Sequence, residues 1–142
     1  MRIEEVMTRD PACCTPETKV RDVARMMVEY DCGEIPLVQN AGDSRHVVGV
    51  ITDRDIVSRL VAQDRNPLDA KASACMTQPV ITVSNAASVE DCIQLMETHR
   101  IRRVPVVDEN GCLCGIVSQA DIAQHAPKAS TGELVREVSQ GS

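Results

Sequence analysis

The sequence predicts an α/β fold of two pseudo-symmetric halves, each a small sheet packed with helices. The phrase GVITDRDI at 49–56 returns as GIVSQADI at 115–122. Around both copies, short runs rich in β-branched residues alternate with stretches that have the apolar spacing of a helix. A half of roughly 55–60 residues buries little core alone, so two packed copies are expected.

The phrase belongs to a longer internal repeat, which sets the domain organisation. Met7 matches Met76 and Pro36 matches Pro105 at the same separation along the chain. A polar stretch, QDRNPLDAKAS, lies between the copies and is typical of a linker. The expected bounds are repeat one at 1–62, a linker at 63–73, repeat two at 74–126 and a tail at 127–142 with at most one short helix.

A short strand and a helix are expected first in each copy. VITV at 80–83 is rich in β-branched residues and predicts a strand, with ACCT at 12–15 as its equivalent. In the helix that follows, Ser88 and Asp91 resemble a capping box. The apolar sides of the two helices are Val20, Val23, Met27 and Tyr30 in copy one, and Val89, Cys92, Ile93 and Met96 in copy two.

Two strands and a second helix complete each copy. Residues 34–39 pair with 46–52, and 103–108 pair with 112–118 across the turn signal ENG. The closing helices start near Asp53 and Gln119.

Composition limits the classes of function. The net charge of −6 argues against general affinity for nucleic acid or anionic membranes. No apolar run approaches the ~20 residues of a membrane span, and the start, MRIEEVMTRD, lacks the apolar region of a signal peptide. We therefore expect a cytoplasmic protein.

Seven cysteines are many for this length, but an odd number without an export signal disfavours a disulfide framework. Cys112 and Cys114 would face one side of a strand, yet no second pair has zinc-site spacing. Core packing is therefore favoured, with a cysteine-based redox or metal-responsive protein as the alternative function. The other cysteines lie among apolar residues: Cys13, Cys14, Cys32, Cys75 and Cys92.

Catalysis has little support in the sequence. His46, His99 and His125 lie in unrelated contexts and form no ligand or triad spacing. Glycine-rich phosphate-binding motifs are missing, and no histidine is nominated as the partner of a nucleophilic cysteine. The sequence therefore predicts a protein that is not an enzyme and holds no metal.

The tandem pattern M-T…P…helix…h-P-V-V-D…G-h-h-[ST]-x-x-D-I resembles a pair of cystathionine-β-synthase (CBS) domains, the Bateman module. This resemblance covers almost the whole chain. It implies a non-catalytic regulatory fold that needs no cofactor and binds AMP, ADP, ATP or a related ligand, such as NAD or S-adenosylmethionine, between the repeats. It also implies a homodimer and a regulated partner protein, which the sequence does not identify.

The T-x-x-D part of the phrase has two interpretations. From spacing alone, Thr52 with Asp55, and Ser118 with Asp121, form capping boxes. The resemblance implies instead that the hydroxyl and carboxylate hold the ribose and phosphate of a ligand. Both roles can coexist.

The copies differ in charge before their central strands. Arg102 and Arg103 in copy two align with Gly33 and Glu34 in copy one. Arginine forks suit phosphate oxygens, whereas a nearby glutamate repels them. The resemblance implies a main site of Thr8, Ala12, Cys13, Cys32, Gly33, Val50, Thr52, Arg54, Asp55, Arg102 and Arg103. It implies a weaker second site of Thr77, Ile81, Glu34, Arg100, Ser118, Ala120 and Asp121.

Apolar helix faces are candidates for the dimer contact. Met26, Met27, Leu95 and Met96 could supply it, and the alternative is that they fill the core within one chain.

Overall fold

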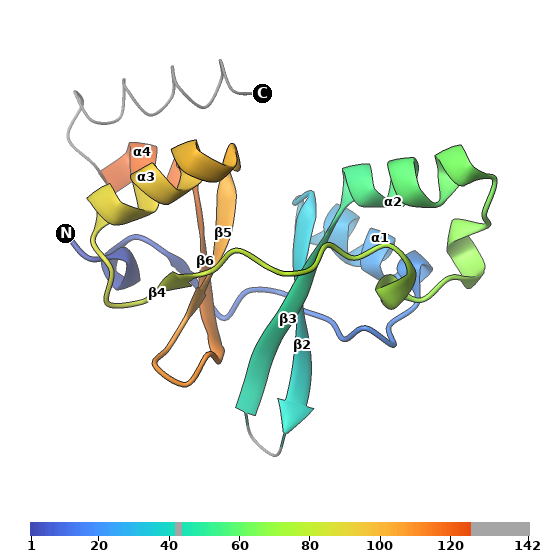
Figure 1. Ribbon diagram of the computed structural model, residues 1–142, viewed down its shortest axis with the longest axis horizontal. Helices are drawn as coiled ribbons and strands as arrows, with labels where there is room; N and C mark the ends of the chain where they lie inside the picture. Colours follow the sequence, from blue (N-terminus) through green and yellow to red (C-terminus); the bar gives the residue numbers. More distant parts are fainter. Residues whose placement is uncertain (42–43, 126–142) are drawn as a thin grey trace. The chain divides into compact units, whose positions relative to one another are not determined.

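The computed structural model describes residues 1–41 and 44–125, so the expected tail helix at 127–142 lies outside the described residues. The chain divides into two compact units. The first-repeat unit is Ala12–Val80, and the second-repeat unit combines Met1–Pro11 with the chain from Ile81 on. The fold is mixed α/β, as the sequence predicted (Figure 1).

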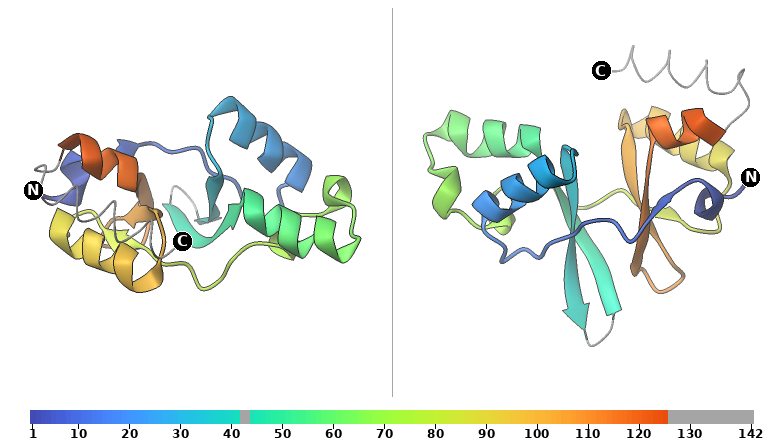
Figure 2. Two further views of the ribbon diagram at one scale, coloured as in Figure 1. Left: turned by 90° about the horizontal axis from the view of Figure 1, so that it is seen from above. Right: turned by 180° about the vertical axis from the view of Figure 1, so that it is seen from behind.

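The first-repeat unit contains the antiparallel pair β2 (Glu34–Ala41) and β3 (Ser44–Thr52). Helix α1 (Val20–Glu29) and helix α2 (Asp53–Arg59) contact each other and these strands (Figure 2). Val20, Val23 and Met27 are buried on one face of α1, which is the spacing of an amphipathic helix.

The second-repeat unit contains a four-stranded sheet in the order β1-β6-β5-β4. Alternate residues of β6 are buried, as expected for a strand with one face on the core. Val89, Cys92 and Met96 of α3 are fully or almost fully buried in that core. The elements are η1 (Ile3–Glu5), β1 (Thr8–Arg9), β4 (Val83–Ser84), α3 (Val89–His99), β5 (Arg103–Val107), β6 (Leu113–Ser118) and α4 (Gln119–His125).

Each unit takes its outer sheet segment from the start of the other sequence repeat. Thr8 of β1 pairs with Ile116 of β6, and at the equivalent place Thr77 forms a bridge with Val50 of β3. The opposite edges of the two sheets also match. Cys14 forms a parallel bridge with Leu37 of β2, and at the equivalent place β4 pairs in parallel with β5. The internal repeat is therefore present in the pairing pattern itself.

The predicted linker packs against the first-repeat unit through backbone hydrogen bonds. The N–H of Val20 donates to the Ala70 carbonyl (2.9 Å), and that of Ala72 donates to the Thr18 carbonyl (2.8 Å). Ala72 is fully buried. The stretch from Val61 to Ala74, which contains the predicted linker, forms three short 3-10 helices, η2 (Val61–Gln63), η3 (Pro67–Asp69) and η4 (Ala72–Ala74).

The structure bears on two expectations about apolar side chains. Tyr30 ends α1 and is 58% exposed, because its position follows the last turn that faces the core. Met27 and Met96 are buried in the cores of their own units, which agrees with the alternative of core packing, whereas Met26 and Leu95 are partly buried. Within the described part of the chain, no helix is long and apolar enough to cross a membrane.

Candidate binding site around Asp55

The repeated phrase forms a capping box in both units. The Thr52 N–H donates to Asp55 Oδ2 and the Asp55 N–H donates to Thr52 Oγ1, both at 3.0 Å. Ser118 and Asp121 repeat the arrangement at 2.9 Å and 3.1 Å. The interpretation from spacing alone is therefore confirmed, and each box fixes a carboxylate at the junction of a strand and a helix.

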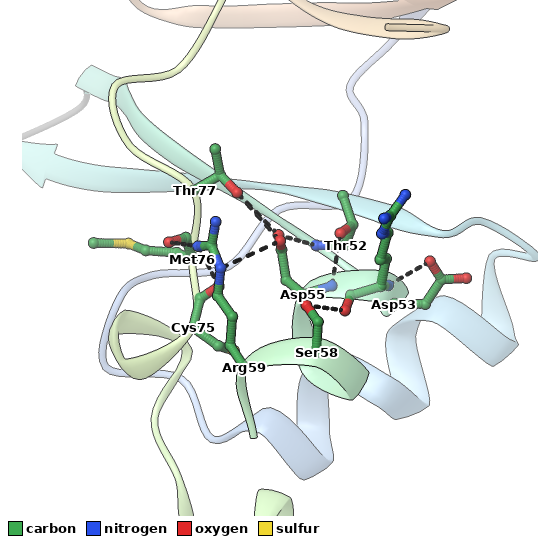
Figure 3. A network of polar contacts seen from close by, with 9 residues as sticks. Thr52, Asp53, Asp55, Ser58, Arg59, Cys75, Met76 and Thr77 are labelled. Carbon is green, nitrogen blue, oxygen red and sulfur yellow. Dashed lines mark hydrogen bonds and ion pairs between the residues drawn. The ribbon is translucent and has the colours of Figure 1, made fainter. Parts of the chain in front are cut away.

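Asp55 has further partners and is the more deeply placed of the two carboxylates. Asp55 is 8% exposed, whereas Asp121 is half-buried. The Thr77 hydroxyl lies 3.2 Å from Oδ2 and 3.3 Å from Oδ1 of Asp55, and Arg59 Nε lies 3.9 Å from Oδ1 (Figure 3). Because a carboxylate desolvated in this way depends on such donors, the network fixes its orientation.

The segment that carries Thr77 is attached to β3 and α2. Val50 and Thr77 exchange backbone hydrogen bonds, and Arg59 Nη1 donates to the carbonyls of Cys75 (3.1 Å) and Met76 (2.7 Å). Arg59 was not among the site residues predicted from the sequence. Its separation of four residues from Asp55 in a predicted helix was the available signal, because such pairs lie on one helix face.

The second-repeat unit has a basic hollow of about 290 Å³. Arg103 of β5 pairs with Ser118 of β6, and the Arg102 carbonyl accepts a hydrogen bond from the Gln119 N–H. Arg100 ends α3 in the left-handed conformation and is exposed. The lining residues are Arg102, Arg103, Ser118, Gln119, Ala120 and Ala123.

The equivalent surface of the first-repeat unit is acidic. Glu34 pairs with Thr52, and the Asp53 N–H donates to the Gly33 carbonyl. A β-carbon on Gly33 would lie 3.0 Å from Asp53 Oδ2, and Asp53 Oδ1 accepts from the Arg54 N–H. The charge difference read from the sequence thus falls on matching places in the two units.

The structure brings together some predicted site residues from each of the two sets. Thr77, assigned by the sequence to the second site, contacts Asp55 of the main site, and Thr8, assigned to the main site, lies in β1 beside β6. In the first-repeat unit lie Ala12, Cys13, Cys32, Gly33, Glu34, Val50, Thr52, Arg54, Asp55 and Thr77. In the second-repeat unit lie Thr8, Ile81, Arg100, Arg102, Arg103, Ser118, Ala120 and Asp121.

All seven cysteines are free thiols. Burial raises the pKa of Cys14 to about 11 and that of Cys92 to about 12, so both stay protonated at neutral pH. Cys13 Sγ lies 3.6 Å from Arg45 Nη1. Across residues 1–41 and 44–125, no three His, Cys, Asp or Glu side chains are grouped as metal ligands.

Comparisons with known proteins identify the repeats. The model of the CBS domain family matches residues 3–62 and 72–128. An uncharacterized protein of Methanopyrus kandleri is 38% identical over 125 residues, which are 88% of this chain and 62% of that protein. This chain therefore spans less than two thirds of that relative.

A second relative matches over most of its length. Hypoxic response protein 1 of Mycobacterium tuberculosis is 33% identical over 134 residues, which cover 94% of this chain and 91% of that protein. The crystal structure of hypoxic response protein I with two coordinated zinc ions has a TM-score of 0.78 at 34% identity, covering 89% of this chain and 100% of that chain.

A third comparison is with a solved CBS domain pair. It was crystallised in complex with 5′-methylthioadenosine and S-adenosyl-L-methionine. The TM-score is 0.76 at 25% identity, and the match covers 87% of this chain and 94% of that chain.

Proposed function

This chain belongs to the CBS domain family as a tandem pair of repeats, and from that premise we propose that it is a non-catalytic regulatory module for an adenosyl ligand. The observation that carries the proposal is the buried, oriented carboxylate of Asp55 with its Thr52 and Thr77 partners. An ionised carboxylate accepts up to four hydrogen bonds and can bind both hydroxyls of a ribose.

The ligand class follows from the chemistry of the two units. Ribose is the part of an adenosyl ligand that Asp55 would bind, and Arg102 and Arg103 would bind a phosphate. We therefore propose AMP, ADP or ATP as the regulatory ligand, with S-adenosylmethionine and NAD as competing ligands. The related CBS pair in complex with two adenosyl compounds supports this class.

Thr77 joins Thr52 and Asp55 in the proposed main site, and Thr8 joins Ser118 and Asp121 in the second. Glu34 disfavours phosphate, because a like charge about 4 Å away costs about 4 kcal/mol at an effective dielectric of 20. We propose that the ligand state of these sites controls a partner protein and that the module acts as a cytoplasmic homodimer.

Calorimetric titration with adenosine, AMP, ATP and S-adenosylmethionine tests the proposal. Asp55→Asn removes a charge from the ribose anchor and should weaken binding about ten- to a hundredfold. Asp53→Asn is the matched control, because that carboxylate is exposed and lies two residues away. If the wild type binds none of these compounds, or if Asp55→Asn binds equally well, the proposal is wrong.

Zinc binding is a second candidate, favoured by the zinc-containing crystal structure of a protein 34% identical to this chain. Within the described residues, no three His, Cys, Asp or Glu side chains are grouped to hold a zinc ion. A zinc site within one chain would therefore need ligands from outside these residues. Metal analysis of the purified protein with thiol titration before and after chelation separates this function from nucleotide binding. Stoichiometric zinc that protects cysteines would favour the metal-responsive alternative.

A further inference from the structure

The Arg59 side chain connects helix α2 to the segment that precedes Thr77. Its Nη1 atom donates to two successive backbone carbonyls, at 2.7 Å for Met76 and 3.1 Å for Cys75. Its Nε atom lies 3.9 Å from Asp55 Oδ1, which is an ion pair longer than a hydrogen bond (Figure 3). One guanidinium therefore contacts the Asp55 carboxylate and the adjoining chain together.

The two carboxylate oxygens of Asp55 differ in their partners. Oδ2 accepts from the Thr52 N–H (3.0 Å) and lies 3.2 Å from the Thr77 hydroxyl. Oδ1 has Thr77 at 3.3 Å and Arg59 at 3.9 Å. The single Thr77 proton can be donated to only one of these oxygens at a time, and when Oδ2 receives it, Oδ1 keeps lone-pair capacity for a ribose hydroxyl beside the Arg59 ion pair.

We propose that Arg59 is a positioning residue for the adenosyl ligand, and this proposal rests on the function proposed above. Arg59 fixes the carbonyls of Cys75 and Met76, and so holds the next residue, Thr77, with its hydroxyl on Asp55. Thr77 in turn orients the carboxylate toward the ligand. Arg59 acts through these two residues and needs no contact with the ligand itself.

The second repeat provides an internal comparison. Aligning Asp55 with Asp121 places His125 at the position of Arg59, and Met7 and Thr8 match Met76 and Thr77. An imidazole has at most two N–H groups, so it cannot bind two carbonyls and a carboxylate together as a guanidinium does. We call the contacts of Arg59 with Asp55, Cys75 and Met76 the clamp. The clamp is therefore a feature of the first repeat and favours the ligand that binds at Asp55.

A purely structural role is the competing explanation, because the Arg59 side chain is 47% exposed and partly exposed ion pairs contribute little to stability. A double-mutant cycle separates the two roles. AMP affinity is measured for the wild type, Arg59→Gln, Thr77→Ala and the double variant. If Arg59 acts through Thr77, each single change weakens AMP about tenfold and the double variant is no weaker than Thr77→Ala.

Two further variants sharpen the cycle. Arg59→His imitates the second repeat and should lose as much AMP affinity as Arg59→Gln. Arg59→Lys keeps one charged donor, and should recover part of the affinity. The control is Arg25→Gln on α1, whose guanidinium pairs with exposed Asp22 and should leave AMP affinity unchanged. Unchanged affinity in Arg59→Gln, or fully additive losses in the cycle, would overturn the proposal.

A measurement without ligand keeps the clamp separate from the proposed function. The Thr77 N–H donates to the Val50 carbonyl at 2.7 Å, and its hydrogen exchange reports opening of the segment. Arg59→Gln should accelerate this exchange about tenfold, while the Val38 N–H in the same unit stays protected. If the wild type binds no adenosyl ligand, the proposed function is wrong, but the clamp is still tested. It would be overturned if the Thr77 N–H exchanged at the same rate in Arg59→Gln as in the wild type.

Discussion

Thr77 and Val50 exchange two backbone hydrogen bonds, at 2.7 Å and 3.2 Å, and so attach the start of the second sequence repeat to the sheet of the first. The glycine beside Val50 makes this approach possible. A β-carbon on Gly49 would lie 3.0 Å from the Thr77 carbonyl oxygen, which is backbone and cannot rotate away. The glycine of the repeated phrase is therefore required where the two segments meet.

Gly49→Ala should lower the free energy of unfolding by about 1–3 kcal/mol, because added volume at a close backbone contact forces the segment away from β3. Gly33→Ala is the matched control. Its β-carbon would also approach within 3.0 Å, but of the mobile end of exposed Asp53. Urea unfolding of both variants measures the difference, and equal losses would show that the Thr77 contact is not the cause.

Arg103→Ala should weaken AMP about tenfold while sparing adenosine, because only the phosphate loses a charged partner. Calorimetry with the two ligands gives the ratio directly. Equal losses for AMP and adenosine would mean that Arg103 supports the fold of the hollow rather than the phosphate.

Asp121→Ala should change AMP affinity far less than Asp55→Ala, because in our proposal Glu34 disfavours phosphate at the second site and Arg59, which holds the Met76 carbonyl, positions the first. The same calorimetric titrations compare the two variants. If Asp121→Ala removes AMP binding while Asp55→Ala does not, the two sites have been assigned in the wrong order.

Cys92 should make the protein less stable in alkali. Its pKa is raised by burial from 9.0 to about 12, so above about pH 9 the thiol ionises in the unfolded chain before it does in the folded one. The free energy of unfolding should then fall by about 1.4 kcal/mol per pH unit from this group alone. Urea unfolding of wild type and Cys92→Ala between about pH 8 and 10.5 compares the slopes, and identical slopes would contradict the assignment.

A homodimer is expected to use the exposed face of α1, where Val28 is 84% exposed between Arg25 and Glu29. In a two-fold pairing of this face, each arginine can meet the glutamate of the other copy. Val28→Asp should therefore shift the mass measured by light scattering at micromolar concentration toward that of a monomer. Val57→Asp on α2 is the control for adding a charge elsewhere, and a monomeric wild type would contradict the expectation.

Local patterns predicted the helices, the long strands and both capping boxes well, because each depends on neighbours within a few residues. Thr52 and Asp55 are an example, since a spacing of three places the hydroxyl and carboxylate on each other's backbone N–H. The cores followed similarly from the apolar spacing of α1 and α3.

The contacts of Thr8 and Thr77 could not be predicted, because strand pairing is set by chain topology rather than by local sequence. Aligned repeats show which residues are equivalent, but not which unit each segment joins. Arg59 was missed for a related reason: its carbonyl partners, at Cys75 and Met76, belong to a segment on the far side of the linker. The i, i+4 spacing indicated only its pairing with Asp55.

The assignment of Met1–Pro11 to the second-repeat unit also bears on biosynthesis. Ile3 is fully buried and donates to the Ala87 carbonyl, while Thr8 pairs with Ile116 near the other end of the described chain. During translation, the continuous segment Ala12–Val80 can therefore complete its unit while the residues just before it still lack their partners. A chain starting at Ala12 should keep amide protection in β2 and β3 and lose it in β6. Although residues 1–11 precede Ala12–Val80 in the chain, they are thus expected to fold after it.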